Sequence, residues 1–266
     1  MADTRTPVAV VTGASSGIGE VFARKLAARG YDLILVARRA DRLHSLASEL
    51  SPRRVEVVTA DLTTSDGLQA AEQGIRNCPQ LDLLVNNAGF GTVKRFWEAD
   101  LHGQEQMHQL HVMATVRLTH AALNLMVAQG RGAIINVSSV AAFGQTEGNV
   151  SYCATKAWVN AFTQGLDIEL RGAGYKGKIK VQALCPGYTM SEFHDTLGVD
   201  RNNIPRVLWM QADAVVDASL RGLEQGKVVV IPGTVYKIGA SLMRHLSHEA
   251  RRRIGKPGKL GKDRRV

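Results

Sequence analysis

Apolar positions along this chain fall into short runs separated by longer stretches with helical spacing. The runs are rich in Val, Ile and Leu and do not alternate with polar residues, which is typical of strands covered by helices on both faces. The intervening stretches 19–29, 41–50 and 152–171 repeat apolar residues at helical intervals. This succession predicts a doubly wound, mostly parallel α/β sheet with helices on both faces. Its seven strands are expected at residues 8–12, 32–37, 55–59, 81–86, 133–137, 179–185 and 228–231.

The alternation continues toward residue 250 without a linker rich in Pro, Ser or Gly and without a short-period repeat. Residues 1–250 are therefore predicted to form a single domain. Its least regular part is an apolar insertion, residues 187–210, after the sixth strand. In an open α/β sheet, ligands bind beyond the carboxyl ends of the strands, so this insertion is placed to cover a ligand crevice. The alternative is an ordinary pair of surface helices.

Composition narrows the class of protein. With 45% hydrophobic and 21% charged residues, the chain of 266 residues is close to the globular average. Its three cysteines lie far apart, which argues against a disulfide framework and favours a reducing, cytoplasmic setting. Most histidines lack partners at metal-ligand spacing, so we expect no metal site. The apolar runs are much shorter than the ~18 residues of a membrane span, and we expect no signal sequence at the amino terminus.

Positive charge is concentrated at the carboxyl end. Residues 251–266 hold eight Lys and Arg against Asp263, so this segment accounts for most of the formal net charge of +9. We expect a flexible tail. Such a tail can bind nucleic acid or anionic lipid by releasing counterions, but nucleic acid is disfavoured because no aromatic side chain interleaves to stack on bases. Peripheral contact with a membrane surface stays open as an alternative.

An apolar helical stripe precedes the tail. It can pack within the fold, join a second subunit or lie on a membrane surface, and of these we favour subunit packing. The stripe consists of Tyr236, Ile238, Leu242, Met243 and Leu246.

A glycine-rich string, Thr12 to Gly19, directly follows the first predicted strand and opens the first helix. Glycine lets the backbone approach a pyrophosphate, and a helix amino end offers free N–H groups and partial positive charge. A nucleoside triphosphate loop of the Walker type is excluded because no Lys-Ser/Thr pair follows. The predicted ligands of a dinucleotide are Gly13, Ser15, Ser16, Gly17, Ile18 and Gly19.

The end of the second predicted strand distinguishes the two nicotinamide dinucleotides, because the adenosine ribose lies there. NAD-binding proteins place Asp or Glu at this point, whereas this chain has Ala37 followed by Arg38 and Arg39. Guanidinium groups pair with a 2′-phosphate, so the sequence favours NADP(H). The alternative is that the two arginines merely begin a solvated helix.

Tyr152 and Lys156 are four residues apart in a segment with helical spacing, so their side chains share one face. An ammonium beside a phenol favours the phenolate, and we therefore expect a Tyr152 pKa below its usual value of about 10. Such a hydroxyl can serve as an acid or base near neutral pH. Ser139 ends the fifth predicted strand, at the edge of the sheet where this fold gathers its active groups.

Together these motifs resemble the short-chain dehydrogenase/reductase family, in its single-domain Rossmann form of about 250 residues. The resemblance runs from about residue 8 to residue 231. It rests on TGASSGIG at 12–19, ADL at 60–62, NNAG at 86–89, NVSS at 136–139, YCATK at 152–156 and Pro-Gly at 186–187.

The resemblance implies an NADPH-dependent oxidoreductase that reduces a ketone or aldehyde, or oxidises the matching alcohol, and assembles as a homodimer or homotetramer. Residues 186–210 indicate an apolar substrate. Tyr152 would donate the proton, Ser139 would hold the carbonyl oxygen, and Lys156 would lower the tyrosine pKa and bind the nicotinamide ribose. Further cofactor contacts are implied for Asp61 and Leu62 at the adenine, Asn87, Ala88 and Gly89 along the groove, and Pro186, Gly187 and Thr189 beside the nicotinamide.

One position departs from the family pattern. The family usually has an asparagine in the helix after NNAG, where it supports a proton path behind the lysine, and spacing places His111 there. An imidazole can donate and accept through its two nitrogens, so we expect the relay to persist and His111→Asn to keep activity with a shifted pH profile.

Two other functions remain open: a sensor that binds NADP(H) without turnover, and a protein that acts on nucleic acid or a membrane surface through its tail.

Overall fold

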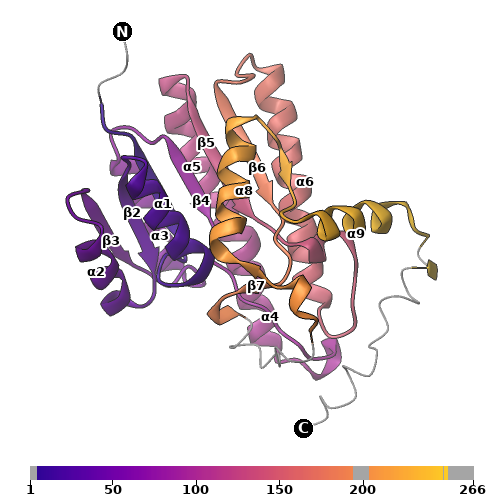
Figure 1. Cartoon of the computed structure of the whole chain (residues 1–266). Coiled ribbons are helices and arrows are strands. Elements are labelled where there is room, and N and C mark those ends of the chain that lie inside the picture. The colour runs from indigo at the N-terminus through magenta and orange to yellow at the C-terminus, as the bar shows by residue number, and fades with distance from the viewer. Residues whose placement is uncertain (1–4, 194–203, 248, 251–266) are drawn as a thin grey trace.

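A parallel sheet of seven strands forms the centre of the molecule, in the order β3-β2-β1-β4-β5-β6-β9 (Figure 1). The computed structural model describes residues 5–193, 204–247 and 249–250. The doubly wound α/β fold is confirmed, and each predicted strand appears with ends shifted by two residues or fewer. The strands are β1 (Val8–Thr12), β2 (Asp32–Ala37), β3 (Val55–Thr59), β4 (Leu83–Asn86), β5 (Gly132–Val137), β6 (Ile179–Leu184) and β9 (Val229–Val230).

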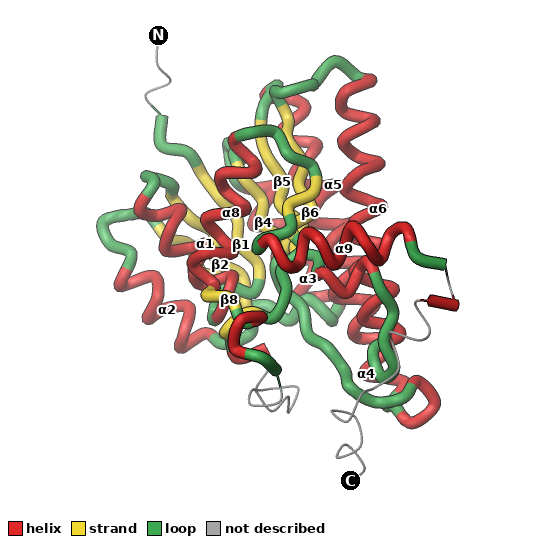
Figure 2. The backbone as a smooth tube through the Cα atoms, turned by 45° about the vertical axis from the view of Figure 1, so that its right-hand side comes forward, coloured by secondary structure: helices red, strands yellow, loops and turns green. Residues whose placement is uncertain are grey.

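Helices cover both faces of the sheet, and each layer has its own apolar cluster. On one face lie α1 (Gly17–Ala28), α2 (Ala40–Glu49) and α8 (Ala212–Glu224). The other face carries α3 (Ser65–Asn77), α5 (Ala114–Gln129) and α6 (Val150–Gly172). In Figure 2 the strands can be followed between these layers. Both faces are buried, which explains why the strand sequences lack polar alternation.

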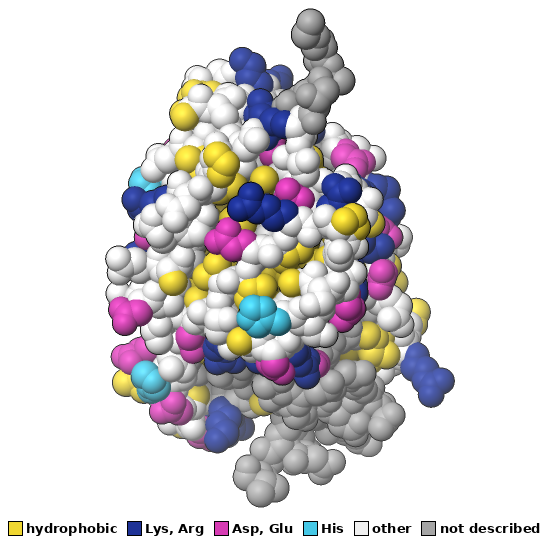
Figure 3. Space-filling model, turned by 90° about the vertical axis from the view of Figure 1, so that its left-hand side faces the viewer, with side chains coloured by type: hydrophobic (Ala, Val, Ile, Leu, Met, Phe, Trp, Pro, Cys, Tyr) yellow, Lys and Arg dark blue, Asp and Glu magenta, His cyan; other side chains and the backbone are white. Residues whose placement is uncertain are grey.

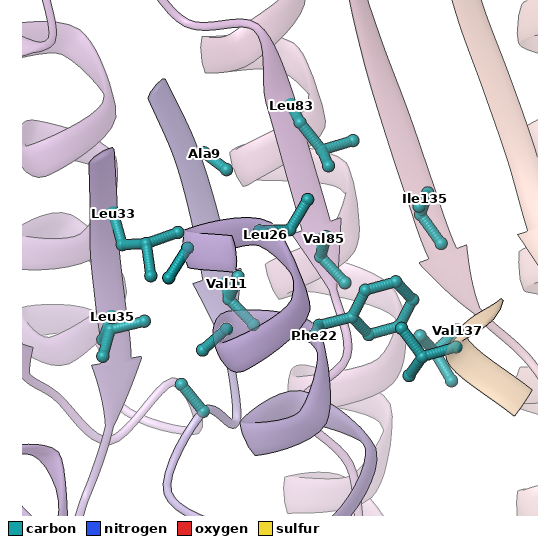
Figure 4. Close-up of a cluster of buried hydrophobic side chains, with 14 of the residues drawn as sticks. Ala9, Val11, Phe22, Leu26, Leu33, Leu35, Leu83, Val85, Ile135 and Val137 are labelled. Atoms are coloured by element: carbon teal, nitrogen blue, oxygen red, sulfur yellow. The ribbon is translucent and has the colours of Figure 1, made fainter. Parts of the chain in front are cut away.

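Helix α1 shows how a layer is anchored (Figure 4). Its Phe22 and Leu26 side chains are buried against Val11 and Val85 of the central strands β1 and β4. Full burial of one such side chain contributes roughly 1.5–3 kcal/mol. The helix is thus fixed directly behind the glycine-rich turn that precedes it.

The strand order places a topological switch point at the middle of the sheet. From β1 the chain builds outward through β2 and β3, and then returns to place β4 on the other side of β1. The connections on the two sides diverge at the carboxyl ends of β1 and β4, where Thr12 and Asn86 end these strands. In doubly wound folds this is where a ligand crevice opens.

The predicted insertion 187–210 is described in part. Its first residues form β7 (Thr189–Met190), which pairs in parallel with β8 (Met210–Gln211), and a 3-10 turn covers Arg206–Leu208. Residues 194–203 lie outside the described part, so the choice between a cover and a pair of surface helices is not tested there.

Helix α4 (Leu101–His108) leads into α5 through a π-helical turn, Gln109–Met113, and α9 (Thr234–His245) follows β9. The predicted stripe on α9 divides between the fold and the surface. Tyr236 donates a hydrogen bond to the Leu208 carbonyl oxygen, whereas Ile238 and Leu242 are 65% and 57% exposed.

Along the described ranges, none of the helices combines the length and the apolar character that crossing a bilayer requires. On the face shown in Figure 3, Lys and Arg side chains are interspersed with Asp and Glu. The basic segment 251–266 lies outside the described residues.

Candidate active site

The glycine-rich turn forms one wall of the site and is closely packed. Gly13 and Gly17 have φ angles of +65° and +57°, in the left-handed region that favours glycine. A Cβ at Gly13 would lie 2.8 Å from the Asn87 amide nitrogen, and a Cβ at Gly19 would overlap the Gly13 carbonyl oxygen. Three of the predicted glycine positions therefore have structural reasons to be glycine.

The NNAG motif fastens this turn to β4. The Asn87 side-chain amide donates to the carbonyl oxygens of Thr12 and Gly13 at 2.9 and 3.3 Å. In return, the Thr12 hydroxyl oxygen accepts the backbone N–H groups of Asn87 and Ala88. Asn87 and Ala88 thus adjoin the glycine-rich turn, and we name this assembly of residues 12–19 and 86–89 the glycine wall.

The glycine wall fits a pyrophosphate. Helix α1 is 12 residues long and begins at Gly17, and the hydroxyl of its N-cap residue Ser16 makes no capping hydrogen bond. The N–H groups of the first turn are therefore left for an anion, and the helix dipole favours negative charge there. Ser15, Ser16 and Ile18 lie in this turn between the glycines.

The adenosine end of the groove carries the two predicted arginines in different settings. Arg39 donates from Nε and Nη2 to the Ser15 hydroxyl, at 3.2 and 3.1 Å, so its guanidinium lies against the glycine wall. Arg38 is 75% exposed and lies 3.7 Å from the Asp61 carboxylate. Hydrogen bonds from Thr63 and the charge of Arg38 outweigh burial and lower the pKa of Asp61. Leu62 is buried in the core under α3, so a contact with adenine would come from its backbone.

The predicted chemical groups converge at the carboxyl end of β5. The Ser139 hydroxyl accepts the Ala141 N–H at 3.1 Å, which fixes it at the start of a 3-10 turn, Val140–Phe143. Tyr152 lies in the first turns of α6, where its side chain interacts with that of Ser139. One turn further along α6, the ammonium of Lys156 lies 5.7 Å from the centre of the Tyr152 ring.

The expected direction of the tyrosine pKa is wrong for this structure. Burial raises the pKa of Tyr152 to about 12, although the neighbouring Ser139 side chain acts in the opposite direction. The Lys156 ammonium donates to the Val137 carbonyl oxygen at 2.9 Å, and burial lowers its pKa to about 8. Desolvation penalises both charged forms here, and it outweighs the attraction that sequence reasoning relied on. At neutral pH the phenol carries its proton.

His111 reaches the same centre from the π-helical turn. Its ring is buried, its Nε2 accepts the Phe90 N–H at 3.2 Å, and its Nδ1 lies 2.9 Å from the Thr155 hydroxyl. An accepting Nε2 leaves the proton on Nδ1, so the imidazole is neutral and donates to Thr155. Burial, with the charge of Lys156, holds the pKa of His111 well below 6.5. The structure brings His111 to Tyr152, with 5.8 Å between ring centres.

The Gly89 position keeps His111 and Lys156 together. A Cβ there would lie 2.8 Å from His111 Nε2 and 3.5 Å from Lys156 Nζ. Glycine is therefore the residue that allows the imidazole and the ammonium to approach the groove from two different helices.

The segment after β6 belongs to the predicted insertion, and it supplies one residue, Glu192, that sequence reasoning missed. We name residues 189–193 the strap. A Cβ at Gly17 would lie 3.0 Å from the Ser191 Cβ, so the strap meets the glycine wall. Glu192 forms an ion pair with Arg39, and the Phe193 ring lies 5.9 Å from that of Tyr152. No local pattern marks these residues, because each contact joins segments far apart in sequence.

Pro186 and Gly187 lead into the strap and are held from two sides. The Pro186 carbonyl accepts the Val140 N–H at 3.0 Å, which ties this turn to the one after Ser139. The Tyr236 ring fills the space beside Gly187, and its hydroxyl accepts the Tyr188 N–H at 3.0 Å. Of the predicted residues 186, 187 and 189, Pro186 is therefore tied directly to the turn that Ser139 begins.

Within the described ranges, no three His, Cys, Asp or Glu side chains gather in a way that could hold a metal ion.

Comparison with known proteins agrees with this geometry. The model of a family described as short chain dehydrogenase matches residues 7–202. The chain belongs to the short-chain dehydrogenase family. An uncharacterised oxidoreductase of Staphylococcus epidermidis is 34% identical over 226 residues, which cover 85% of this chain and 94% of that protein.

Solved structures of short-chain dehydrogenases superimpose over most of the chain. A short-chain dehydrogenase from Sphingobium yanoikuyae in complex with NADPH is 36% identical, with a TM-score of 0.80 and coverage of 91% of this chain and 97% of that one. A bulky-bulky ketone specific alcohol dehydrogenase from Comamonas testosteroni is 32% identical, with a TM-score of 0.77 and coverage of 92% and 96%. The family resemblance and the oxidoreductase class are confirmed.

Proposed function

We propose that this short-chain dehydrogenase is an NADP(H)-dependent oxidoreductase that reduces an apolar ketone or aldehyde, or oxidises the matching alcohol, with Tyr152 as the acid or base. The observation that carries the proposal is the placement of the Ser139 and Tyr152 side chains together at the carboxyl end of β5, beside the Lys156 ammonium. This pair lies at the carboxyl edge of the sheet, where the glycine wall offers a pyrophosphate site.

In the direction of reduction, Ser139, Tyr152 and Lys156 have different roles. The hydroxyls of Ser139 and Tyr152 hold the carbonyl oxygen and polarise it. A reduced nicotinamide bound in the groove would supply the hydride that the carbonyl carbon requires. Tyr152 then gives its proton to the oxygen, for which a pKa of about 12 keeps the phenol protonated beforehand. The Lys156 ammonium stabilises the phenolate left behind, and it binds the nicotinamide ribose.

Two arginines support the preference for NADP(H). Arg38 and Arg39 follow β2, and Arg39 lies against Ser15 of the glycine wall, so a 2′-phosphate at this point would meet guanidinium groups. The Sphingobium relative was solved with NADPH, which agrees with this assignment. We expect Arg38→Ala to raise the KM for NADPH about tenfold and to leave that for NADH nearly unchanged.

An apolar substrate is supported by the side chains beside Tyr152. Phe193 lies beside Tyr152 and Phe90 beside His111, and the apolar side chains of Tyr188, just before the strap, and Met190, within it, are exposed. The Comamonas relative is described as specific for bulky-bulky ketones, which is consistent with a wide pocket.

The decisive experiment is a panel of short and bulky ketones, aldehydes and the corresponding alcohols, each measured with NADPH and with NADH by absorbance at 340 nm. We expect turnover of bulky apolar ketones with NADPH. Binding of NADPH without turnover of any substrate would instead favour a sensor.

We further propose a homo-oligomer in which α9 contributes to subunit packing. Ile238 and Leu242 are the exposed part of the predicted stripe, and they lie on one face of this helix. Sedimentation at micromolar concentration should show a dimer or tetramer, whereas a monomer would refute this assembly.

A further inference from the structure

An ionic cluster joins the strap to the adenosine end of the groove. Glu192 accepts hydrogen bonds from Arg39 Nη1 at 2.9 Å and from Arg42 Nη1 at 2.5 Å, one on each carboxylate oxygen. The same Arg39 guanidinium donates to Ser15 of the glycine wall. One carboxylate is thus shared by two guanidinium groups, directly beside the turn proposed to hold the cofactor.

These guanidinium groups are the ones that a 2′-phosphate would use. Arg39 is at the N-cap of α2, and Arg42 is in its first turn, so both follow β2 where the adenosine ribose lies in this fold. A phosphate monoester carries a charge of about −1.5 to −2 near pH 7, and it pairs with guanidinium in the same fork geometry as a carboxylate. Glu192 and the 2′-phosphate are therefore two anions directed to one cationic site.

Glu192 keeps its negative charge across the working range of pH. The hydrogen bonds from Arg42 and Arg39 lower its pKa to about 2, so the carboxylate stays ionised. Its side chain is 45% exposed, and those of Arg39 and Arg42 are 40% and 46% exposed. Such partly exposed pairs are individually weak and can exchange partners without unfolding their surroundings.

We propose that Glu192 is a specificity-determining residue that competes with the 2′-phosphate of NADP(H) for Arg39 and Arg42. The inference rests on the proposed use of NADP(H). A cofactor with the 2′-phosphate displaces the carboxylate and detaches the strap from α2, whereas NAD(H) leaves this ion pair in place. Arg42, which sequence reasoning did not select, thereby becomes a third basic residue of the cofactor site.

Equilibrium binding tests this without turnover. Isothermal titration calorimetry of the full chain with 2′,5′-ADP, NADP⁺ and NAD⁺ is compared for the wild type and Glu192→Gln. Removing the competing charge should lower the Kd of 2′,5′-ADP and of NADP⁺ by about 3- to 10-fold, and that of NAD⁺ by less than twofold. The matched control is Glu49→Gln, which removes another exposed carboxylate that is paired with an arginine, Arg24, and should change none of the three.

Each alternative outcome has a separate meaning. A Kd for NADP⁺ that is unchanged or higher in Glu192→Gln would overturn the competition, because the carboxylate would then be neutral to the cofactor or would hold it. A wild type that binds NAD⁺ as tightly as NADP⁺ would instead overturn the proposed cofactor preference. Tighter binding of 2′,5′-ADP to Glu192→Gln would still support competition in that case.

Discussion

The two sides of the cofactor groove are built by different kinds of interaction. The glycine wall is joined by short backbone contacts and by the partly buried hydrogen bonds between Thr12 and Asn87. The strap meets the groove through a half-exposed ion pair at Glu192 and a ring contact at Phe193. A wall made from backbone is stiff, whereas side-chain contacts of this kind can be exchanged. The groove thus has one rigid side and one side whose contacts can be exchanged.

The largest expected effect concerns Tyr152, the group that lies between these two sides. Tyr152→Phe removes the proton donor but keeps the ring that contacts Phe193. We expect turnover to fall about 10²- to 10⁴-fold while binding of NADP⁺ changes little. Steady-state rates and calorimetry measure the two quantities. Tyr175→Phe is the control, and an equal loss there or unchanged turnover in Tyr152→Phe would contradict the role.

The stiffness of the glycine wall predicts the next effect. In Gly19→Ala the new methyl group would overlap the Gly13 carbonyl oxygen, which belongs to the backbone and has little freedom to move. The variant should lose about 1–3 kcal/mol of unfolding free energy or more. Chemical denaturation followed by circular dichroism gives this value. The control is Gly165→Ala, in α6 with nothing within 4 Å of the added carbon, whose free energy of unfolding should rise slightly. Equal stability of the two variants would contradict a rigid glycine wall.

The pH dependence of reduction sharpens the assignment of Lys156. The pKa of Tyr152 is about 12 and that of Lys156 about 8, so the lysine is the first of the two to lose its proton as pH rises. We expect kcat/KM for ketone reduction to be level near pH 7 and to fall above about pH 8. Initial rates with NADPH between pH 6.5 and 9.5 test this. A kcat/KM that stays level to pH 9.5 would show that reduction does not depend on the charged form of Lys156.

The smallest effect is expected at His111. An asparagine can also accept the Phe90 N–H and donate to the Thr155 hydroxyl, so His111→Asn should keep activity within about threefold. The imidazole pKa is held well below 6.5, so a change of the pH profile should be confined to acid pH.

Stability provides a second measure of His111. The folded protein keeps this ring neutral, whereas the unfolded chain protonates it below about pH 6.5, so stability falls as pH decreases through that value. Thermal denaturation from pH 7 to pH 5 should therefore show a steeper loss for the wild type than for His111→Asn. The exposed His120→Asn should behave as the wild type, and identical slopes for all three would contradict a buried neutral imidazole.

The features that could be predicted from the sequence are those whose physical cause lies within a short segment of the chain. The strands are uniformly apolar because both faces are covered, and the turn at Gly13 and Gly17 needs left-handed backbone, so both could be predicted. Sequence reasoning failed for the pKa of Tyr152, since the cost of burial depends on side chains from several distant segments. Glu192 and Arg42 were missed for the same reason, because their attraction spans 150 residues of sequence.

Tyr236 joins α9 to the insertion beside the candidate active site. Its hydroxyl links the Tyr188 backbone to Leu208, the two ends of the insertion around the site. A chain that ends just after β9 would retain every strand of the central sheet. It would lose the two hydrogen bonds by which Tyr236 connects Tyr188 with Leu208. We therefore expect removal of α9 to disturb the insertion beside the candidate active site, while the central sheet stays folded.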